Sequence, residues 1–163
     1  RFQMRHKARH HAEFKSLPVH AITRGVKPFA TKDEWYFNMR FRDGKAGVKD
    51  ILVATPSDTV RDGPYVSPKG PYPHIQAAKG RPETMMWAVE RPDGGRGFGF
   101  TGGHFHLNWQ NEDQRRLMLN ALVWLAKLEV PAGGIHSAPV SDAEAQQNLD
   151  EKPARKAAPG KKK

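Results

Sequence analysis

The residues whose types and spacing could do chemistry gather in one short stretch, Gly94–Trp109, with the sequence GGRGFGFTGGHFHLNW. Aromatic and small residues alternate through its first half, which predicts a buried strand lying close to another backbone. Gly102 and Gly103 end this strand, and His104 and His106 follow directly. Polar side chains at the end of a strand, a few residues ahead of a helix, are typical of a ligand site in an open α/β sheet.

The two histidines suit hydrogen bonding and proton transfer better than metal binding. An imidazole titrates near neutrality, so His104 or His106 could bind hydroxyl groups or act as a general acid or base. In an extended H-x-H segment the side chains point to opposite faces, and no third ligand is in view, so we expect no metal and no other cofactor. The alternative for His104 is a structural histidine, hydrogen-bonded at a strand end. The candidate substrate-binding residues around the histidines are Arg24, Glu34, Arg40, Arg96, Gly102, Gly103 and Trp109.

Alternating patterns predict the strands that must position these residues. Asp33–Arg42 alternates apolar with polar residues, so we expect one strand with Glu34 and Arg40 on its polar face. Residues 83–101 are expected to form an antiparallel hairpin around the turn sequence RPDGG, with the candidate site on its second arm. Three shorter elements are also expected, a strand within Glu13–Val19, a helical turn at His20–Val26 and a buried strand at Asp50–Thr55.

A helix is expected after the histidines, and a long loop before the hairpin. Asn111 can cap the helix, with Gln114 at the third position completing a capping box. One apolar stripe at helical spacing is expected to pack into the core, formed by Leu117, Ala121, Trp124, Leu125 and Leu128. Residues 57–82 are rich in proline and glycine, which predicts a long surface loop. The tyrosines and the histidine of this loop either stack on a ligand or attach the loop to the body.

The net charge of +10 over 163 residues is concentrated at the two ends of the chain. Residues 1–15 hold five basic residues and one acidic residue, and residues 150–163 hold six basic and two acidic residues, which leaves +2 for the middle. Solvated basic ends fit this distribution better than a specific nucleic-acid interface, which needs a basic face on the folded part. The chain has no cysteine and no apolar run of about 18 residues, so we expect no thiol nucleophile, no disulfide framework and no membrane span.

Four stretches of the chain together resemble the ThuA-like (trehalose utilisation) family, namely HAITRGV, DEWYFNMRF, ETMMWAVERPDGGRGFGFTGGHFHLNW and ALVWLAKLEVPAGGIHS. The resemblance covers roughly residues 14–137 and implies an α/β fold, the flavodoxin-like sandwich of the class I glutamine amidotransferases. Such domains are longer than this chain, so the resemblance implies that the N-terminal strands are missing. Residues 1–13 are then a basic N-terminal segment, and residues 138–163 a disordered tail rich in Lys, Ala and Pro.

The resemblance also implies a role in the utilisation of trehalose or a related disaccharide. In the amidotransferase relatives a histidine between a late strand and the last helix activates a catalytic cysteine. His104 matches that place best, with His106 as its rival. This chain has no cysteine, and no acidic residue directly follows the histidine, so glutamine amidotransferase activity is not expected. The alternative function is a non-catalytic module that binds carbohydrate or another protein.

The expected partner is a small carbohydrate, without specific nucleic-acid binding and without a membrane. A sheet that lacks its first strands exposes an edge, so the domain is expected either to pair with a second copy or to need the missing N-terminal portion. The chain starts at Arg1, and neither this start nor the lack of cysteine indicates a compartment.

Overall fold

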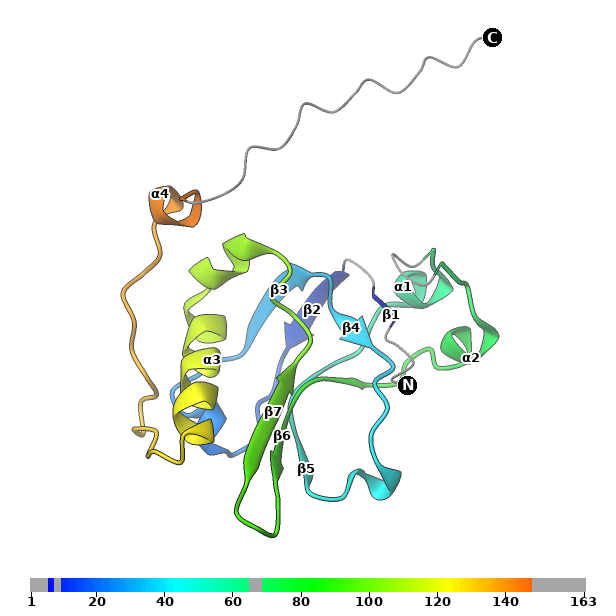
Figure 1. Ribbon diagram of the computed structural model, residues 1–163. Helices are drawn as coiled ribbons and strands as arrows, with labels where there is room; N and C mark the ends of the chain where they lie inside the picture. The colour runs from blue at the N-terminus through cyan, green and yellow to red at the C-terminus, as the bar shows by residue number, and fades with distance from the viewer. Residues whose placement is uncertain (1–5, 8–9, 65–68, 148–163) are drawn as a thin grey trace.

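Antiparallel strand pairs and one long helix make up the computed structural model, which describes residues 6–7, 10–64 and 69–147 (Figure 1). Strand β1 (His6–Lys7) pairs with β4 (Tyr36–Phe37), and β2 (His10–Phe14) pairs with β3 (Phe29–Asp33). A larger sheet has the order β5, β6, β7, with the bounds Val48–Ala54, Glu83–Glu90 and Arg96–Phe100. This mixed α/β architecture is the class expected from the sequence.

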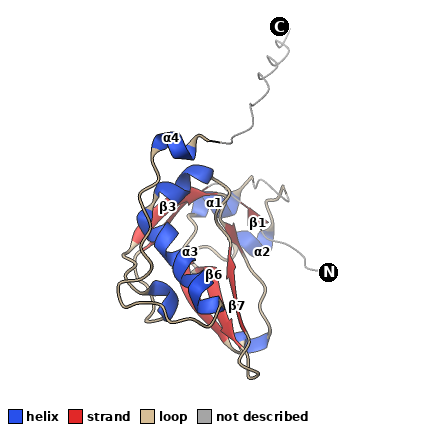
Figure 2. Ribbon diagram, turned by 60° about the vertical axis from the view of Figure 1, so that its left-hand side comes forward, coloured by secondary structure: helices blue, strands red, loops and turns tan. Residues whose placement is uncertain are grey.

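Helix α3 (Glu112–Leu125) covers one side of the strands, as Figures 1 and 2 show. The other helical segments are short, namely η1 (Ala21–Thr23), η2 (Asp43–Lys45), α1 (Asp58–Asp62), α2 (Pro73–Gln76), η3 (His106–Gln110) and α4 (Asp142–Ala145). The apolar core includes Phe14, Trp35 and Leu117, all fully buried. Among the helices of the described ranges, none is long and apolar enough to cross a membrane.

The predicted hairpin is confirmed, since β6 and β7 pair antiparallel and the turn closes with a 2.8 Å hydrogen bond from Arg91 N to Gly95 O. Trp87 faces Gly99 across the two strands. A Cβ atom on Gly99 would lie 2.2 Å from the Trp87 ring, so the glycine leaves the room that the indole occupies. In the described chain β7 pairs only with β6, which makes it an edge strand, so its residues are half-buried and not buried as the alternation predicts.

The single strand predicted for Asp33–Arg42 is wrong. Strand β3 ends at Asp33, β4 holds only two residues, and Asn38 has a φ of 57°, which interrupts the extended backbone. Asp33, Glu34 and Trp35 are consecutive and all buried, which a strand with one exposed face does not allow. The cause is tertiary packing, because Trp35 Nε1 donates to Thr31 O at 3.2 Å and the ring packs edge-on against aromatic core residues.

Helix α3 begins as predicted, with Asn111 Oδ1 accepting the backbone N–H of Gln114 at 2.9 Å. The capping box is not completed, because the Gln114 side chain is fully buried and its amide atoms make no hydrogen bond in the structure. Leu117, Ala121 and Trp124 lie in the core as expected, whereas Leu125 and Leu128 are 38% and 63% exposed. The helix ends at Leu125, and Lys127 has a φ of 61°, so the helical spacing does not continue to Leu128.

Two of the three shorter predicted elements are present, and the third is wrong for most of its length. The strand expected at Glu13–Val19 overlaps β2 only at residues 13–14, because β2 ends at Phe14 and residues 15–19 belong to no strand, whereas the buried strand at Asp50–Thr55 is β5. The helical turn at His20–Val26 is η1, where His20 Nδ1 accepts the N–H of Ile22 at 3.2 Å. The expected loop at residues 57–82 contains α1 and α2, and its Tyr65 lies outside the described residues.

After α3 the chain turns back along the helix and leads to α4 (Figure 1). We expected disorder from residue 138 onward, but α4 is a helix with a capping box between Ser141 and Glu144, and its Ala145 is buried. Gln110 Nε2 donates to Asp142 Oδ1 at 2.7 Å, which attaches this segment to η3. The rest of the expected tail, residues 148–163, lies outside the described chain.

Candidate functional site

A buried carboxylate, Asp33, holds the loop that carries the candidate histidines. Its Oδ2 accepts Gly103 N at 2.7 Å and Asn108 Nδ2 at 2.9 Å, and its Oδ1 accepts His104 N at 3.1 Å and Phe105 N at 3.2 Å. The side chain is fully buried at the end of β3. Hydrogen bonds to a carboxylate are stronger than those between neutral groups. The loop after β7 is therefore fixed to the end of β3 by four hydrogen bonds to one side chain, and Asn108 Nδ2 also donates to Lys32 O at 2.9 Å.

The exposed side chain of His104 faces the buried carboxylate of Glu34, the residue after Asp33. The distance from His104 Nε2 to Glu34 Oε1 is 3.7 Å, and the side chains are 48% and 2% exposed. This distance is within ion-pair range and longer than a direct hydrogen bond, but it is too short for an oxygen atom to lie on the line between the two atoms. A hydroxyl group can approach the imidazole only from its exposed side. The arrangement places an accessible imidazole beside a carboxylate in the protein interior, which suits binding of hydroxyls and proton transfer.

Gly102 and Gly103 allow the loop to adopt its conformation next to the core. Gly103 has a φ of 90°, a conformation that residues with side chains rarely adopt. A Cβ atom on Gly102 would lie 2.6 Å from the Trp35 ring, so the backbone passes directly over this core residue. A Cβ atom on Gly103 would lie 3.7 Å from Trp109, so the half-buried indole is a neighbour of the loop. The structure thus brings Gly102, Gly103 and Trp109 together with His104.

Two of the candidate arginines lie at the other end of α3. Arg96 Nη1 donates to Trp124 O at 2.9 Å, and its guanidinium lies 5.1 Å from the centre of the Trp124 ring. Arg24 Nη1 donates to Val130 O and lies 3.8 Å from Glu129 Oε1. The site loop leads into the opposite end of α3, which has 14 residues and is therefore about 20 Å long. The structure does not bring these arginines to His104.

The two remaining candidates are exposed. Arg40 lies beyond β4 with its side chain exposed, and the broken strand does not place it on one face with Glu34. His106 is the first residue of η3 and is also exposed. Of the predicted polar candidates, only His104 and Glu34 therefore lie in contact with each other. In the part of the chain that the structure describes, no three His, Cys, Asp or Glu residues are grouped so that they could hold a metal ion.

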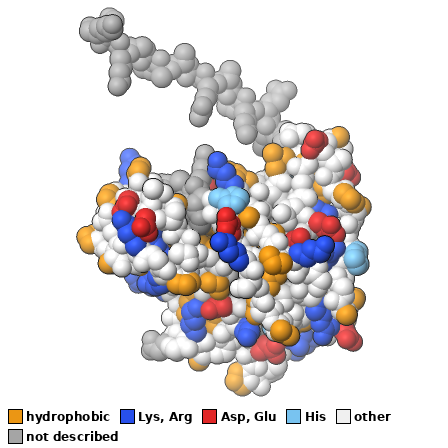
Figure 3. Space-filling model, turned by 180° about the vertical axis from the view of Figure 1, so that it is seen from behind, with side chains coloured by type: hydrophobic (Ala, Val, Ile, Leu, Met, Phe, Trp, Pro, Cys, Tyr) orange, Lys and Arg blue, Asp and Glu red, His pale blue; other side chains and the backbone are white. Residues whose placement is uncertain are grey.

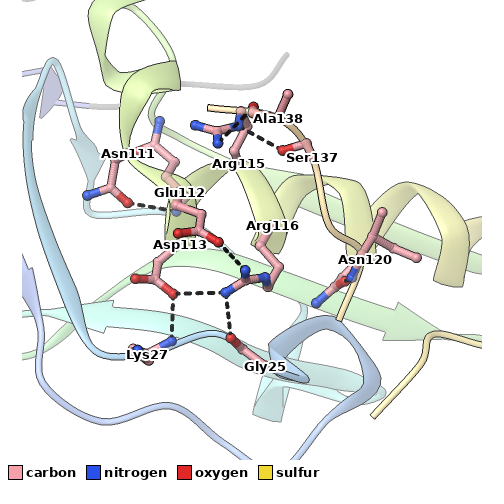
Figure 4. Close-up of polar contacts among 12 residues, drawn as sticks. Gly25, Lys27, Asn111, Glu112, Asp113, Arg115, Arg116, Asn120, Ser137 and Ala138 are labelled. Atoms are coloured by element: carbon pink, nitrogen blue, oxygen red, sulfur yellow. Dashed lines mark hydrogen bonds and ion pairs between the residues drawn. The ribbon is translucent and has the colours of Figure 1, made fainter. Parts of the chain in front are cut away.

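Polar contacts on α3 anchor the segments on either side of the helix (Figure 4). Arg116 Nη1 donates to Gly25 O at 2.9 Å, and Asp113 Oδ1 accepts Lys27 N at 2.8 Å. On the other side, Arg115 donates to Ser137 Oγ at 2.9 Å through Nε. A second donor of Arg115, Nη1, binds Trp109 O at 2.7 Å. The end of the site loop is therefore attached to the helix and to the returning chain.

Asp33 is the residue that the sequence patterns missed. Its position before Glu34 at the end of a strand is the only local signal, and the alternation of residues 33–42 assigned it to the start of a strand instead. The donors that it binds lie about 70 residues further along the chain. Such a contact is visible only once β3 and the loop after β7 lie side by side.

Comparison with known proteins agrees with the family resemblance. Residues 2–125 match the family model of ThuA, described as trehalose utilisation. No match was found among curated proteins or among solved structures. Because the family model covers more than half of the 163 residues, the chain belongs to the ThuA (trehalose utilisation) family.

Proposed function

We propose that the chain binds trehalose or a related disaccharide at the loop of residues 102–109, with the accessible His104 contacting sugar hydroxyls and the buried Glu34 orienting its imidazole. The family match supports a role related to trehalose utilisation. The observation that carries the proposal is the 3.7 Å approach of His104 Nε2 to Glu34 Oε1, with the carboxylate buried and the imidazole accessible.

The chemistry of this pair matches that of a sugar. Each sugar hydroxyl both donates and accepts hydrogen bonds, a neutral imidazole does the same at its two nitrogens, and a carboxylate accepts. Trp109 and Phe105 are half-buried neighbours of the pair, so they add apolar surface for the C–H face of a sugar ring. None of these contacts requires a charge on the ligand.

Catalysis at this site would use His104 as the group that moves a proton. An imidazole beside a carboxylate is oriented by it and can take a proton from a hydroxyl or return one to it. The chain has no cysteine, so the covalent chemistry of the amidotransferases has no nucleophile here. A non-catalytic carbohydrate-binding module uses the same contacts without turnover, and an assay for the consumption of trehalose, whatever the product, separates the two functions.

Calorimetric titration with trehalose tests the proposal. We expect His104→Ala to weaken the Kd about tenfold, which corresponds to the loss of one hydrogen bond. His106→Ala tests the rival histidine and should have a smaller effect, because His106 lies outside the contact with Glu34. His136→Ala is the matched control, since His136 is an exposed histidine beyond α3. No heat with trehalose or related disaccharides, or an unchanged Kd for His104→Ala, would overturn the proposal.

A further inference from the structure

An open groove of about 430 Å³ lies where the β2–β3 pair meets the three-stranded sheet. One wall comes from β2 and the residues after it, and the other from the end of β5 with Thr55 and Pro82. Strands β2 and β5 lie in contact, but in the described chain each forms its hydrogen-bond ladder with a different strand. The groove therefore follows a seam between two sheets. Its volume is within the range of about 300–1,000 Å³ for small-molecule sites.

The groove is separate from the loop that carries His104. Along β2, His11 and Glu13 are exposed and line the groove, whereas Ala12 and Phe14 are buried in the core. Successive side chains of a strand point to opposite faces, so the groove lies on the outer face of the β2–β3 pair. Asp33, which holds the His104 loop, is buried on the core side of the same pair.

The polar groups of the groove are balanced in charge. Glu13 Oε2 and Lys15 Nζ form an ion pair at 3.1 Å, and both side chains are largely exposed. Figure 3 shows the same mixture of signs on the rear face of the molecule, where acidic and basic side chains lie next to one another. An anionic ligand would have to displace Glu13 from Lys15, and a cationic ligand would have to displace Lys15 from Glu13. The lining thus favours a neutral ligand.

Hydrogen-bonding and apolar groups both line the same groove. His11 and Thr55 both donate and accept hydrogen bonds, and Glu13 accepts them. Val53, which is 37% exposed, and Pro82 add apolar surface. A neutral ligand that meets all of these groups must carry many hydroxyls on a partly apolar frame. Mono- and disaccharides have this composition.

We propose that the groove between β2 and β5 is a second carbohydrate-binding site, which takes a neutral sugar of up to disaccharide size. Its location and its preference for a neutral ligand rest on the groove alone, and the choice of trehalose as the first probe rests on the proposed function. Surface ion pairs contribute little to stability, so exchanging Glu13 or Lys15 for contacts with sugar hydroxyls costs the fold little.

Nuclear magnetic resonance titration of the whole chain with trehalose, and then with maltose, tests this site. The amide signals of Val53 and Thr55 report on the groove, and those of Gly102 and Gly103 report on the His104 loop. We expect both sets to shift, with separate dissociation constants. The groove constant should not change at high salt, because the ligand is neutral.

Variants assign the signals to their sites. His11→Ala combined with Glu13→Gln should weaken binding at the groove at least tenfold and leave binding at the loop unchanged. Lys32→Ala is the matched control, because Lys32 is the exposed partner of His11 on β3 and does not line the groove. The double variant should retain the wild-type melting temperature, since both side chains are exposed.

The outcomes separate the two proposals. If only the loop signals shift, the groove proposal is overturned and the proposed function stands. If only the groove signals shift, the second site stands and the location given under the proposed function is wrong. If neither sugar shifts the groove signals, or if the double variant binds there as tightly as the wild type, the groove is no carbohydrate site.

Discussion

Replacing Asp33 with asparagine should release the loop that carries His104, because only one of the two acceptor atoms survives. Oδ1 of Asp33 accepts three backbone N–H groups, and Oδ2 accepts Gly103 N at 2.7 Å and Asn108 Nδ2 at 2.9 Å. An asparagine that keeps its oxygen at the Oδ1 position turns its NH₂ group towards the two donors bound by Oδ2. Two hydrogen bonds to a buried carboxylate are then lost.

The cost of this loss can be estimated from the number of bonds. A hydrogen bond to a charged group contributes about 1.5–3 kcal/mol, so two of them amount to about 3–6 kcal/mol. Because Asp33 is fully buried, solvent does not screen these contacts. Domains of this kind have a total free energy of unfolding of about 5–15 kcal/mol. The variant is therefore expected to lose a large part of the free energy of unfolding, with its largest change at the loop.

Urea unfolding measures the global change, and hydrogen exchange at the amides of Gly103, His104 and Phe105 measures the loop directly. We expect these amides to lose protection even where the domain stays folded. Asp93→Asn is the matched control, because Asp93 is an exposed aspartate that accepts Gly95 N at 2.8 Å, and little change is expected there. A loss below about 1 kcal/mol for the Asp33 variant, with the three amides still protected, would refute the anchoring role.

Three further predictions concern packing, pH and the anchoring of α3. Gly99→Ala should cost about 1–3 kcal/mol in urea unfolding, because its Cβ would lie 2.2 Å from Trp87. Gly97→Ala on the same strand meets no atom within 4 Å and should be tolerated, so equal effects would contradict the packing argument. Burial lowers the pKa of His20 from 6.5, so its neutral form contributes stability above pH 6.5 that is lost as the pH falls through the lower pKa of the folded state. His20→Asn keeps an acceptor for the Ile22 N–H but does not titrate in this range. Between about pH 7 and pH 5 the melting temperature of this variant should fall less than that of the wild type. Parallel melting curves would show that His20 does not cause the pH dependence. Asn120→Ala should cost about 2–4 kcal/mol in urea unfolding, because it removes hydrogen bonds to Ile22 O, Arg24 O and Ile135 N that are 2.9, 2.9 and 2.8 Å long; a change below about 1 kcal/mol would show that water replaces them.

Local patterns predicted those elements whose signals lie within a few residues. The turn RPDGG joins β6 to β7, and Asn111 caps α3, because each feature depends on neighbours in the sequence. The strand predicted for Asp33–Arg42 failed although its alternation is the most regular in the chain. There the Trp35 ring packs against Phe14 and Phe100, and these long-range contacts bury three consecutive residues. For residues 33–42, packing in the core therefore outweighs the local propensity for a strand.

The candidate site was predictable only in part, for a similar reason. The strand end with its glycines identified the loop of His104, and the structure brings Glu34 to it. That these two residues bind a substrate stays a prediction. Asp33 was missed because its donors belong to a distant segment, and the groove was missed because it forms between strands that the sequence does not pair.

The positions of Arg24 and Arg96 limit what kind of ligand the His104 loop can recognise. Arg96 Nη1 donates to Trp124 O in the last turn of α3, where the helix dipole places partial negative charge, and Arg24 Nη1 donates to Val130 O beyond the end of the helix. The two guanidinium groups therefore make their hydrogen bonds near the C-terminal end of α3, whereas the site loop leads into its N-terminal end. Arg40 is exposed away from the pair, so the contact between His104 and Glu34 has no guanidinium beside it from these candidates. Under the proposed function, these three arginines are not available to pair with the phosphate of a phosphorylated sugar, and an uncharged disaccharide would rely on hydrogen bonds to His104.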